Sequence, residues 1–114
     1  MLAGAQRAVT AYGHLGGGVV QGQARTRPDK PAYHVRSGGD WVPTTWATYA
    51  SQVSAVARSL IALGMEPGQA TCILGFNRPE WTIVDPATMA AGGVPAGIHP
   101  TCSPSEVGYI VGHT

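Results

Sequence analysis

The sequence carries little charge, and this shortage excludes several kinds of protein. Of its 114 residues only 11% are Asp, Glu, Lys or Arg, where about a quarter is typical. The formal net charge is +1 and 44% of the residues are hydrophobic, so repulsion between like charges should not keep the chain unfolded. The sequence has no basic stripe that could follow a phosphate backbone, and we expect no nucleic-acid partner.

Cysteine is scarce as well. Cys72 and Cys102 lie far apart, and neither has a second cysteine close by. This spacing fits neither a disulfide framework nor a zinc ribbon, and we expect both thiols to be reduced in a cytoplasmic protein. His99 stands shortly before Cys102, but two candidate ligands do not make a metal site, and we expect no metal and no catalytic cysteine there.

Signals for secretion and for membrane insertion are missing too. The first residues contain no apolar segment of the signal-peptide type. The longest weakly polar stretch, residues 82–98, is interrupted by Asp85, Pro86 and Pro95, whereas a membrane span needs about 20 mostly apolar residues. We therefore expect a cytoplasmic protein without a transmembrane segment.

Length limits the chain to one domain, or to part of one. Residues 1–18 are predicted to be a poorly ordered lead-in, with at most a short helix over Ala3–Ala11 before the glycine run Gly16–Gly18. That run lacks the spacing of a phosphate-binding loop, and we interpret it as a flexible turn. The pattern then predicts a short helix over residues 19–25, a strand over 32–36, a hairpin loop over 37–40 and a return strand starting at Trp41.

The clearest element is an amphipathic helix that begins at Trp46. Thr45 can cap it through its side-chain oxygen, and apolar residues recur along one face as far as Leu63. Gly64 is expected to end the helix in a left-handed conformation, and the Pro-Gly centre of Glu66–Gln69 predicts a type II turn. A helix of this kind is expected to lie on a sheet.

A strand and another helix start follow. Residues 70–76 form a nearly continuous apolar run, which predicts a strand covered on both faces, as in a parallel sheet. Asn77 is expected to cap the next helix, with Pro79 in its first turn and Glu80 completing a capping box.

The rest of this helix and the final elements are also predicted from local signals. Pro86 would cost a continuous helix about 3 kcal/mol, so we expect a kink, or a restart capped by Asp85. Gly92-Gly93 should close the helix, residues 94–99 should form a strand, and Ser103–Glu106 should open a capped final helix.

A strand, a helix and a strand with this spacing predict a βαβ unit with parallel strands and a right-handed crossover. Two parallel strands alone leave unpaired backbone groups along their edges. We therefore expect the sequence to be the N-terminal portion of a larger α/β enzyme. The alternative is a self-standing α/β interaction module that pairs a partner with its exposed sheet edge.

Three segments carry a family resemblance. Trp46–Tyr49 resembles a core motif in which a Thr-Tyr pair opens a helix, and Met89–Pro100 resembles a second, in which Ala-Gly-Gly runs into a strand that ends at proline. Asn77–Trp81 resembles the tag of members that act on fatty acids. In this order and spacing, residues 19–114 resemble the start of long-chain acyl-CoA synthetases, including the very-long-chain type, among the adenylate-forming ligases.

The resemblance implies both fold and activity. The fold is expected to be α/β, a partial N-terminal subdomain of the adenylate-forming ligase fold, with a β-hairpin and a βαβ unit covered by helices. Such enzymes use ATP and Mg²⁺ to turn a fatty acid into an acyl-adenylate, and coenzyme A then displaces AMP. The phosphate loop would follow after Thr114, so residues 19–114 would be an AMP-binding domain truncated before that loop.

The resemblance also implies how this chain would behave alone. We expect it to bind none of these cofactors and to be inactive, with the remainder of the parent ligase as its partner. The parent would be cytoplasmic, and peripheral membrane association of the parent is compatible with the sequence. The signature residues are predicted to be structural rather than catalytic: Trp46, Tyr49, Asn77, Arg78, Pro79, Glu80, Trp81, Gly92, Gly93 and Pro100.

The role of Asn77–Trp81 has two interpretations. The segment could line the entrance through which the acyl chain reaches the active site, or it could contact a lid. We favour a capped helix start with Trp81 packed in the core, because Asn, Pro and Glu stand where capping requires them. Two residues depart from the family pattern, which more often has an aliphatic residue at Pro86 and an aromatic one at His99.

Overall fold

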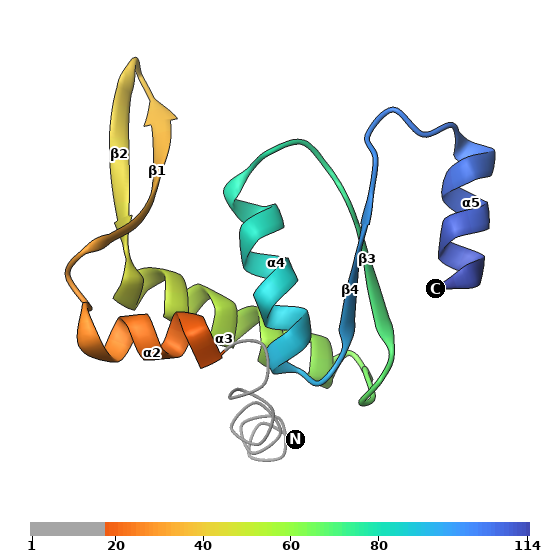
Figure 1. Ribbon diagram of the computed structural model, residues 1–114, viewed down its shortest axis with the longest axis horizontal. Helices are drawn as coiled ribbons and strands as arrows, with labels where there is room; N and C mark the ends of the chain where they lie inside the picture. The colour runs from red at the N-terminus through yellow and green to blue at the C-terminus, as the bar shows by residue number, and fades with distance from the viewer. Residues whose placement is uncertain (1–17) are drawn as a thin grey trace.

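The computed structural model describes residues 18–114, so the predicted lead-in lies outside the described residues except for Gly18, which begins a helix. Figure 1 shows the order of the elements along the chain. They are α2 (Gly18–Thr26), β1 (Pro31–Ser37), β2 (Asp40–Thr45), α3 (Trp46–Ala62), β3 (Ala70–Leu74), α4 (Pro79–Ala90), β4 (Val94–Ile98) and α5 (Pro104–His113).

The strands form two separate pairs. β1 and β2 make an antiparallel hairpin, whereas β3 and β4 are parallel and are joined through α4. The hairpin loop is tight because Gly38 and Gly39 both have positive φ angles, 58° and 89°, which a two-residue turn of this kind requires. The predicted α/β fold with a hairpin and a βαβ unit is confirmed.

The core lies where α3 packs against both α2 and α4 (Figure 1). Val53 and Ala57 of α3 and Ala87 of α4 are completely buried, and the two alanines let the helix backbones approach closely. Thr45 caps α3 as predicted, since its side-chain oxygen accepts a hydrogen bond from the Thr48 amide at 3.2 Å. The predicted left-handed Gly64, with φ of 102°, follows the end of the helix.

The start of α4 differs from the prediction. Arg78, not Asn77, is the N-cap residue, and no side chain caps the helix. The reason is Pro79 at the first helical position, because a residue before proline is held in an extended conformation; Arg78 has φ −136° and ψ 158°. Glu80 is therefore one position too early for a capping box. The predicted restart at Asp85 is also wrong, since α4 runs without interruption from Pro79 to Ala90 with Pro86 inside it.

Helix α5 begins as predicted, with a complete capping box. The Ser103 side chain accepts a hydrogen bond from the Glu106 amide, and the Glu106 carboxylate accepts one from the Ser103 amide at 2.7 Å. The Ser103 amide, followed by its hydroxyl, lowers the pKa of Glu106. No residue of α5 is buried.

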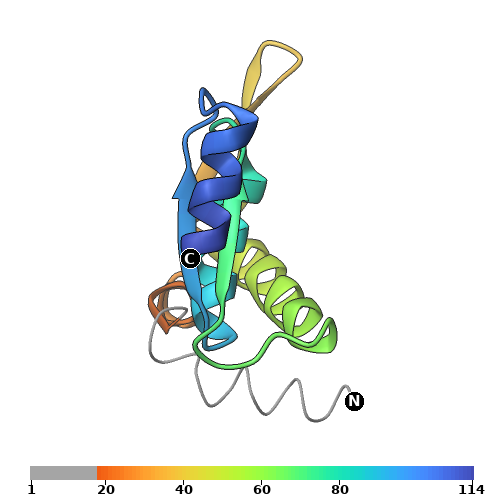
Figure 2. The ribbon, with the colours of Figure 1, turned by 90° about the vertical axis from the view of Figure 1, so that its right-hand side faces the viewer.

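The parallel pair is covered unevenly. Figures 1 and 2 show α4 and α5 on opposite sides of β3 and β4, but α5 leaves apolar side chains uncovered. Leu74 and Val94 are 53% and 55% exposed, and Phe76, just after β3, is 75% exposed. The expectation that residues 70–76 are covered on both faces is therefore wrong for the part of the chain that the structure describes.

Candidate functional site

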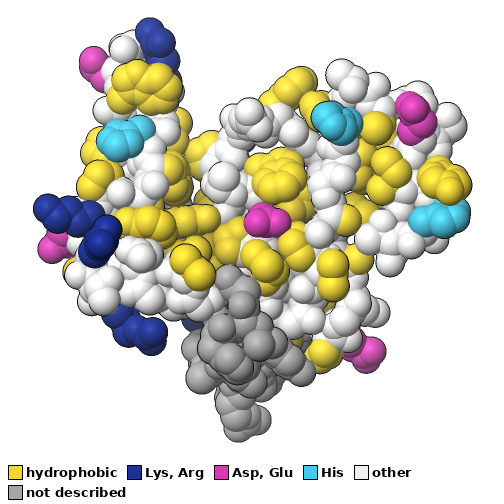
Figure 3. All heavy atoms as spheres, viewed as in Figure 1, with side chains coloured by type: hydrophobic (Ala, Val, Ile, Leu, Met, Phe, Trp, Pro, Cys, Tyr) yellow, Lys and Arg dark blue, Asp and Glu magenta, His cyan; other side chains and the backbone are white. Residues whose placement is uncertain are grey.

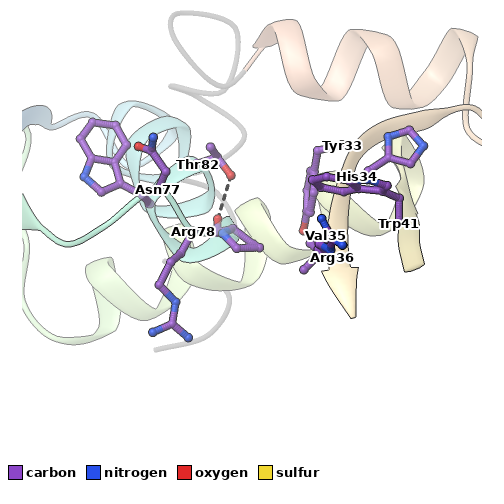
Figure 4. A pocket seen from close by; sticks show the side chains of 10 residues that line it. Tyr33, His34, Val35, Arg36, Trp41, Asn77, Arg78 and Thr82 are labelled. Atoms are coloured by element: carbon purple, nitrogen blue, oxygen red, sulfur yellow. Dashed lines mark hydrogen bonds between the residues drawn. The ribbon is translucent and has the colours of Figure 1, made fainter. Parts of the chain in front are cut away.

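Three adjoining hollows meet at the first turn of α4, and Trp81 lines all of them. One of them, with a volume of about 450 Å³, separates the β1–β2 hairpin from the start of α4; we call it the hairpin groove. Figure 3 shows hydrophobic side chains bordering the hairpin groove. Figure 4 shows its two walls, with Tyr33 and Trp41 on one side and Asn77 and Thr82 on the other. It is lined by Tyr33, His34, Val35, Arg36, Trp41, Asn77, Arg78, Pro79, Trp81 and Thr82.

The second hollow, of about 400 Å³, lies at the carboxyl ends of β3 and β4. In open α/β sheets this is the edge at which ligands bind, so we call it the carboxyl-end hollow. It brings together three of the predicted residues, Asn77, Trp81 and Pro100. Its lining consists of Gly75, Phe76, Asn77, Trp81, Gly97, Ile98, His99 and Pro100.

Trp81 is half-buried at the junction of these hollows, and not in the core as predicted. Two glycines leave room for its indole: a Cβ on Gly97 would stand 3.1 Å from a ring carbon of Trp81, and one on Gly75 would stand 3.9 Å away. A strand glycine of this kind marks a close approach. The indole therefore packs on the ends of the two strands and keeps part of its surface open to the hollows.

The polar residues of the same segment are exposed. The Arg78 Nε lies 3.5 Å from a Glu80 carboxylate oxygen, and both side chains are 69% exposed. An ion pair so open to water contributes little stability. The pair lies beside the hairpin groove, which Arg78 lines.

Tyr49 connects the first signature segment to this site. Its hydroxyl donates a hydrogen bond of 2.6 Å to the Thr82 carbonyl in the first part of α4. Its ring makes an edge-to-face contact with Tyr33, with centroids 5.3 Å apart, and a tilted contact with Trp46 at 5.9 Å. Burial raises the pKa of Tyr49, and Tyr33 and then Asp85 add to the rise.

Gly92 and Gly93 lie at the other end of the strands, away from the hollows. Gly92 has a φ of 87°, which a residue with a side chain rarely adopts. Gly93 is fixed by space: a Cβ there would meet the Met65 methyl at 1.8 Å and the Gln69 carbonyl oxygen at 2.7 Å. Two backbone bonds join this turn to the one after α3, from the Gly68 amide to the Gly92 carbonyl at 2.8 Å and from Val94 to Gln69 at 2.9 Å.

The described residues offer packing surfaces more than reactive groups. Within residues 18–114, no three His, Cys, Asp or Glu side chains lie together as a metal site would need. Cys72 and Cys102 are both free and half-buried, and the Cys102 amide donates to the His99 carbonyl at 3.0 Å in a turn. No helix in this part of the chain is long and apolar enough to cross a membrane.

Sequence reasoning missed Tyr33, Thr82 and Gly97 as members of the site. Thr82 had a usable signal, because a proline inside a helix leaves the carbonyl four residues earlier without its donor, and Pro86 points back to Thr82. Gly97 also had one, since a glycine inside a strand suggests a close neighbour. Nothing local marked Tyr33, whose role depends on a contact with α3.

Most of the chain matches one enzyme family. The model of the AMP-binding enzyme family matches residues 20–114. The chain belongs to the AMP-binding enzyme family.

Curated members of this AMP-binding family include similar sequences. The chain is 39% identical over 75 residues to the long-chain-fatty-acid–CoA ligase ACSBG2 of Gallus gallus, covering 66% of this chain and 10% of the relative. It is 36% identical over 87 residues to the long-chain-fatty-acid–CoA ligase FadD15 of Mycobacterium bovis, covering 76% and 14%. The predicted resemblance to long-chain ligases is confirmed, and the chain spans only 10% to 14% of these relatives.

Solved structures agree on the fold of this AMP-binding chain. An acetoacetyl-CoA synthetase from Streptomyces lividans matches with a TM-score of 0.70 and 35% identity, over 77% of this chain and 14% of that one. The N-terminal subdomain of Klebsiella oxytoca NpsA matches with a TM-score of 0.73 over 83% of this chain and 24% of that one. At 22% identity the second match shows the fold alone. The predicted fold of an N-terminal subdomain of adenylate-forming ligases is confirmed.

Proposed function

We propose that residues 19–114 are the N-terminal part of the AMP-binding domain of a long-chain fatty-acid–CoA ligase. The observation that carries this proposal is the 36% to 39% identity to curated long-chain ligases within a family match over residues 20–114. The reaction of the whole enzyme would activate a fatty acid with ATP through an acyl-adenylate and transfer the acyl group to coenzyme A.

In this proposal the described residues support the enzyme and do not perform its chemistry. Gly92 and Gly93 join the turns at one end of the βαβ unit, and Tyr49 and Trp81 fix the start of α4 at the other. Trp46 packs beside Tyr49, and Asn77, Arg78, Pro79, Glu80 and Pro100 shape the rims of the hollows. We assign no catalytic residue among them.

ATP, Mg²⁺ and coenzyme A would be ligands of the complete enzyme. Residues 18–114 bring no three His, Cys, Asp or Glu side chains together that could hold Mg²⁺, so we derive no metal-dependent step from them. The exposed apolar side chains Leu74, Phe76 and Val94 would be covered by other parts of the ligase, which would be this segment's partner.

The coding sequence after Thr114 tests this proposal. We expect a Thr/Ser/Gly-rich loop followed by a lysine, because such a loop offers backbone donors to a triphosphate. A reading frame that continues without one would overturn the proposal. The purified 114-residue chain should show no ATP–pyrophosphate exchange with a long-chain fatty acid, and measurable exchange would refute the supporting role.

A second candidate function rests on the two-stranded parallel sheet, whose outer edges pair with no other strand of the described residues. An unpaired edge can accept a strand from a partner, so the chain could be an interaction module. Size-exclusion chromatography and amide exchange on the purified chain discriminate between the two functions. A monomer whose β3 and β4 amides are protected favours the module, whereas aggregation through these strands or fast exchange along them favours the ligase segment.

A further inference from the structure

Helix α4 contains a proline that should leave one carbonyl without its donor. Pro86 has no amide hydrogen, so it cannot donate to the carbonyl four residues earlier, which is that of Thr82. The helix nevertheless continues from Pro79 to Ala90, and Pro86 is buried. A carbonyl that loses its helical partner normally requires water or another donor.

Tyr49 supplies this donor from a different helix. Its hydroxyl lies 2.6 Å from the Thr82 carbonyl oxygen, within the range of a strong O–H···O hydrogen bond. The neighbouring hydroxyls are engaged elsewhere: that of Thr82 donates to the Pro79 carbonyl at 2.8 Å, and that of Tyr33 donates to Gln52 at 3.0 Å.

The same tyrosine also touches both walls of the hairpin groove. Tyr33, against which its ring packs at 5.3 Å, lines the hairpin side, and Thr82, whose carbonyl it binds, lines the α4 side. Figure 4 shows these two residues facing each other across the groove. A single side chain of α3 thus contacts the hairpin and α4 at once.

We propose that Tyr49 is a positioning residue whose hydroxyl replaces the amide missing at Pro86 and thereby fixes the first turn of α4 relative to the hairpin. Tyr49 holds Thr82 directly, and through the same helical turn it sets where Trp81 lies against Gly97. This inference concerns the fold of the chain itself and does not depend on the proposed ligase function.

A double-mutant cycle tests the link between Tyr49 and Pro86. Y49F, P86A and the double variant are compared with the original chain by urea unfolding. Y49F should lower the folding equilibrium constant about fivefold, the usual net value of one hydrogen bond, since the exposed Thr82 carbonyl is then left to water. With P86A present, the introduced alanine supplies the missing amide, and the same Y49F change should cost less than about threefold. Equal losses in both backgrounds would overturn the proposal.

A matched control removes a neighbouring hydroxyl in the same way. Y33F loses the bond to Gln52, which has no connection with Pro86, so its effect should be the same with and without P86A. If Y33F depended on residue 86 as strongly as Y49F, the coupling would reflect general loosening of the groove and the proposal would fail.

A spectroscopic readout separates the hydrogen bond from general stability. The ¹³C shift of the Thr82 carbonyl, observed through the Ile83 amide, should change in Y49F and return toward its original value in the double variant. An unchanged Thr82 shift in Y49F would contradict the proposal. Should Y49F fail to fold, the double variant decides: recovered folding supports the proposal and continued unfolding overturns it.

Discussion

Helices α4 and α5 both follow a parallel strand, and both have a proline at their first position, Pro79 and Pro104. Helix α5 begins with a complete capping box between Ser103 and Glu106, but none of its residues is buried. Helix α4 has no side-chain cap, but four of its residues are buried. One helix is thus stabilised by bonds within its own first turn, and the other by contacts with the rest of the protein.

This contrast shows where local sequence signals decide a structure. At α5 nothing competes with the preferences of residues 103–106, so the capping box forms as they dictate. At α4 the contacts with α3 and the strands outweigh the missing cap and the internal proline. Substitutions at the two helices and a pH titration can test the contrast. They follow below from the largest expected change in stability to the smallest.

The largest effect is expected at the junction that ends α4. G93A should destabilise the protein by about 2 kcal/mol, because the added Cβ is forced into a packed site, where the Gln69 carbonyl oxygen would be only 2.7 Å away. Urea unfolding measures the change.

The matched control is the same substitution in α5. A Cβ on Gly108 would meet nothing within 4 Å, and alanine is favoured over glycine inside a helix by roughly 0.5–1 kcal/mol. G108A should therefore raise helix content without harming stability. If G93A and G108A acted in the same direction, the contrast between the two helices would be wrong.

The cap of α5 should have a smaller and local effect. S103A should lower the free energy of opening of α5 by about 1 kcal/mol, because the helix loses its capping acceptor. Faster amide exchange in α5 would show this change. The global unfolding midpoint should hardly move, because α5 buries no residue.

N77A serves as the control for S103A at the other helix. Asn77 does not cap α4, so amide exchange in α4 should change by less than about 0.5 kcal/mol, as for surface substitutions in general. A loss at Asn77 as large as that at Ser103 would mean that the predicted cap of α4 exists after all.

The smallest effect concerns the alkaline limit of stability. The pKa of Tyr49 is raised in the folded protein, first by burial, so the unfolded chain loses its tyrosine proton first, near pH 10. The stabilisation is therefore complete below about pH 10 and is lost as the pH rises further through the folded pKa. Urea midpoints between about pH 8 and 11 should fall more steeply in the original chain than in Y49F, and parallel curves would contradict this.

The same contrast explains how much the sequence could predict. The Thr45 cap, the turn at Gly64 and the box at Ser103 depend on neighbours within a few positions, and all three were predicted correctly. The cap at Asn77 and the restart at Asp85 were predicted wrongly. At the start of α4 a local signal was present, because proline restrains its predecessor, but at Pro86 the compensating donor comes from Tyr49 on another helix.

The candidate site was predicted in part for the same physical reason. Asn77, Trp81 and Pro100 could be picked from the sequence, and the structure brings them into one hollow. The position of the Trp81 indole could not be predicted, because it depends on the space left by two glycines, one after β3 and one within β4. The contact of Tyr49 with Tyr33 likewise joins residues whose proximity no local pattern records.

Residue-resolved amide exchange of the 114-residue chain tests most directly whether α4 is held by tertiary contacts and α5 by its own cap. Amides in the buried second half of α4, at Ala87, Thr88 and Ala90, should exchange only through global unfolding, with the free energy that urea unfolding gives. Amides of α5 should exchange through local opening at a much lower free energy that urea hardly changes. Equal protection of the two helices, or weaker protection of α4, would contradict the account.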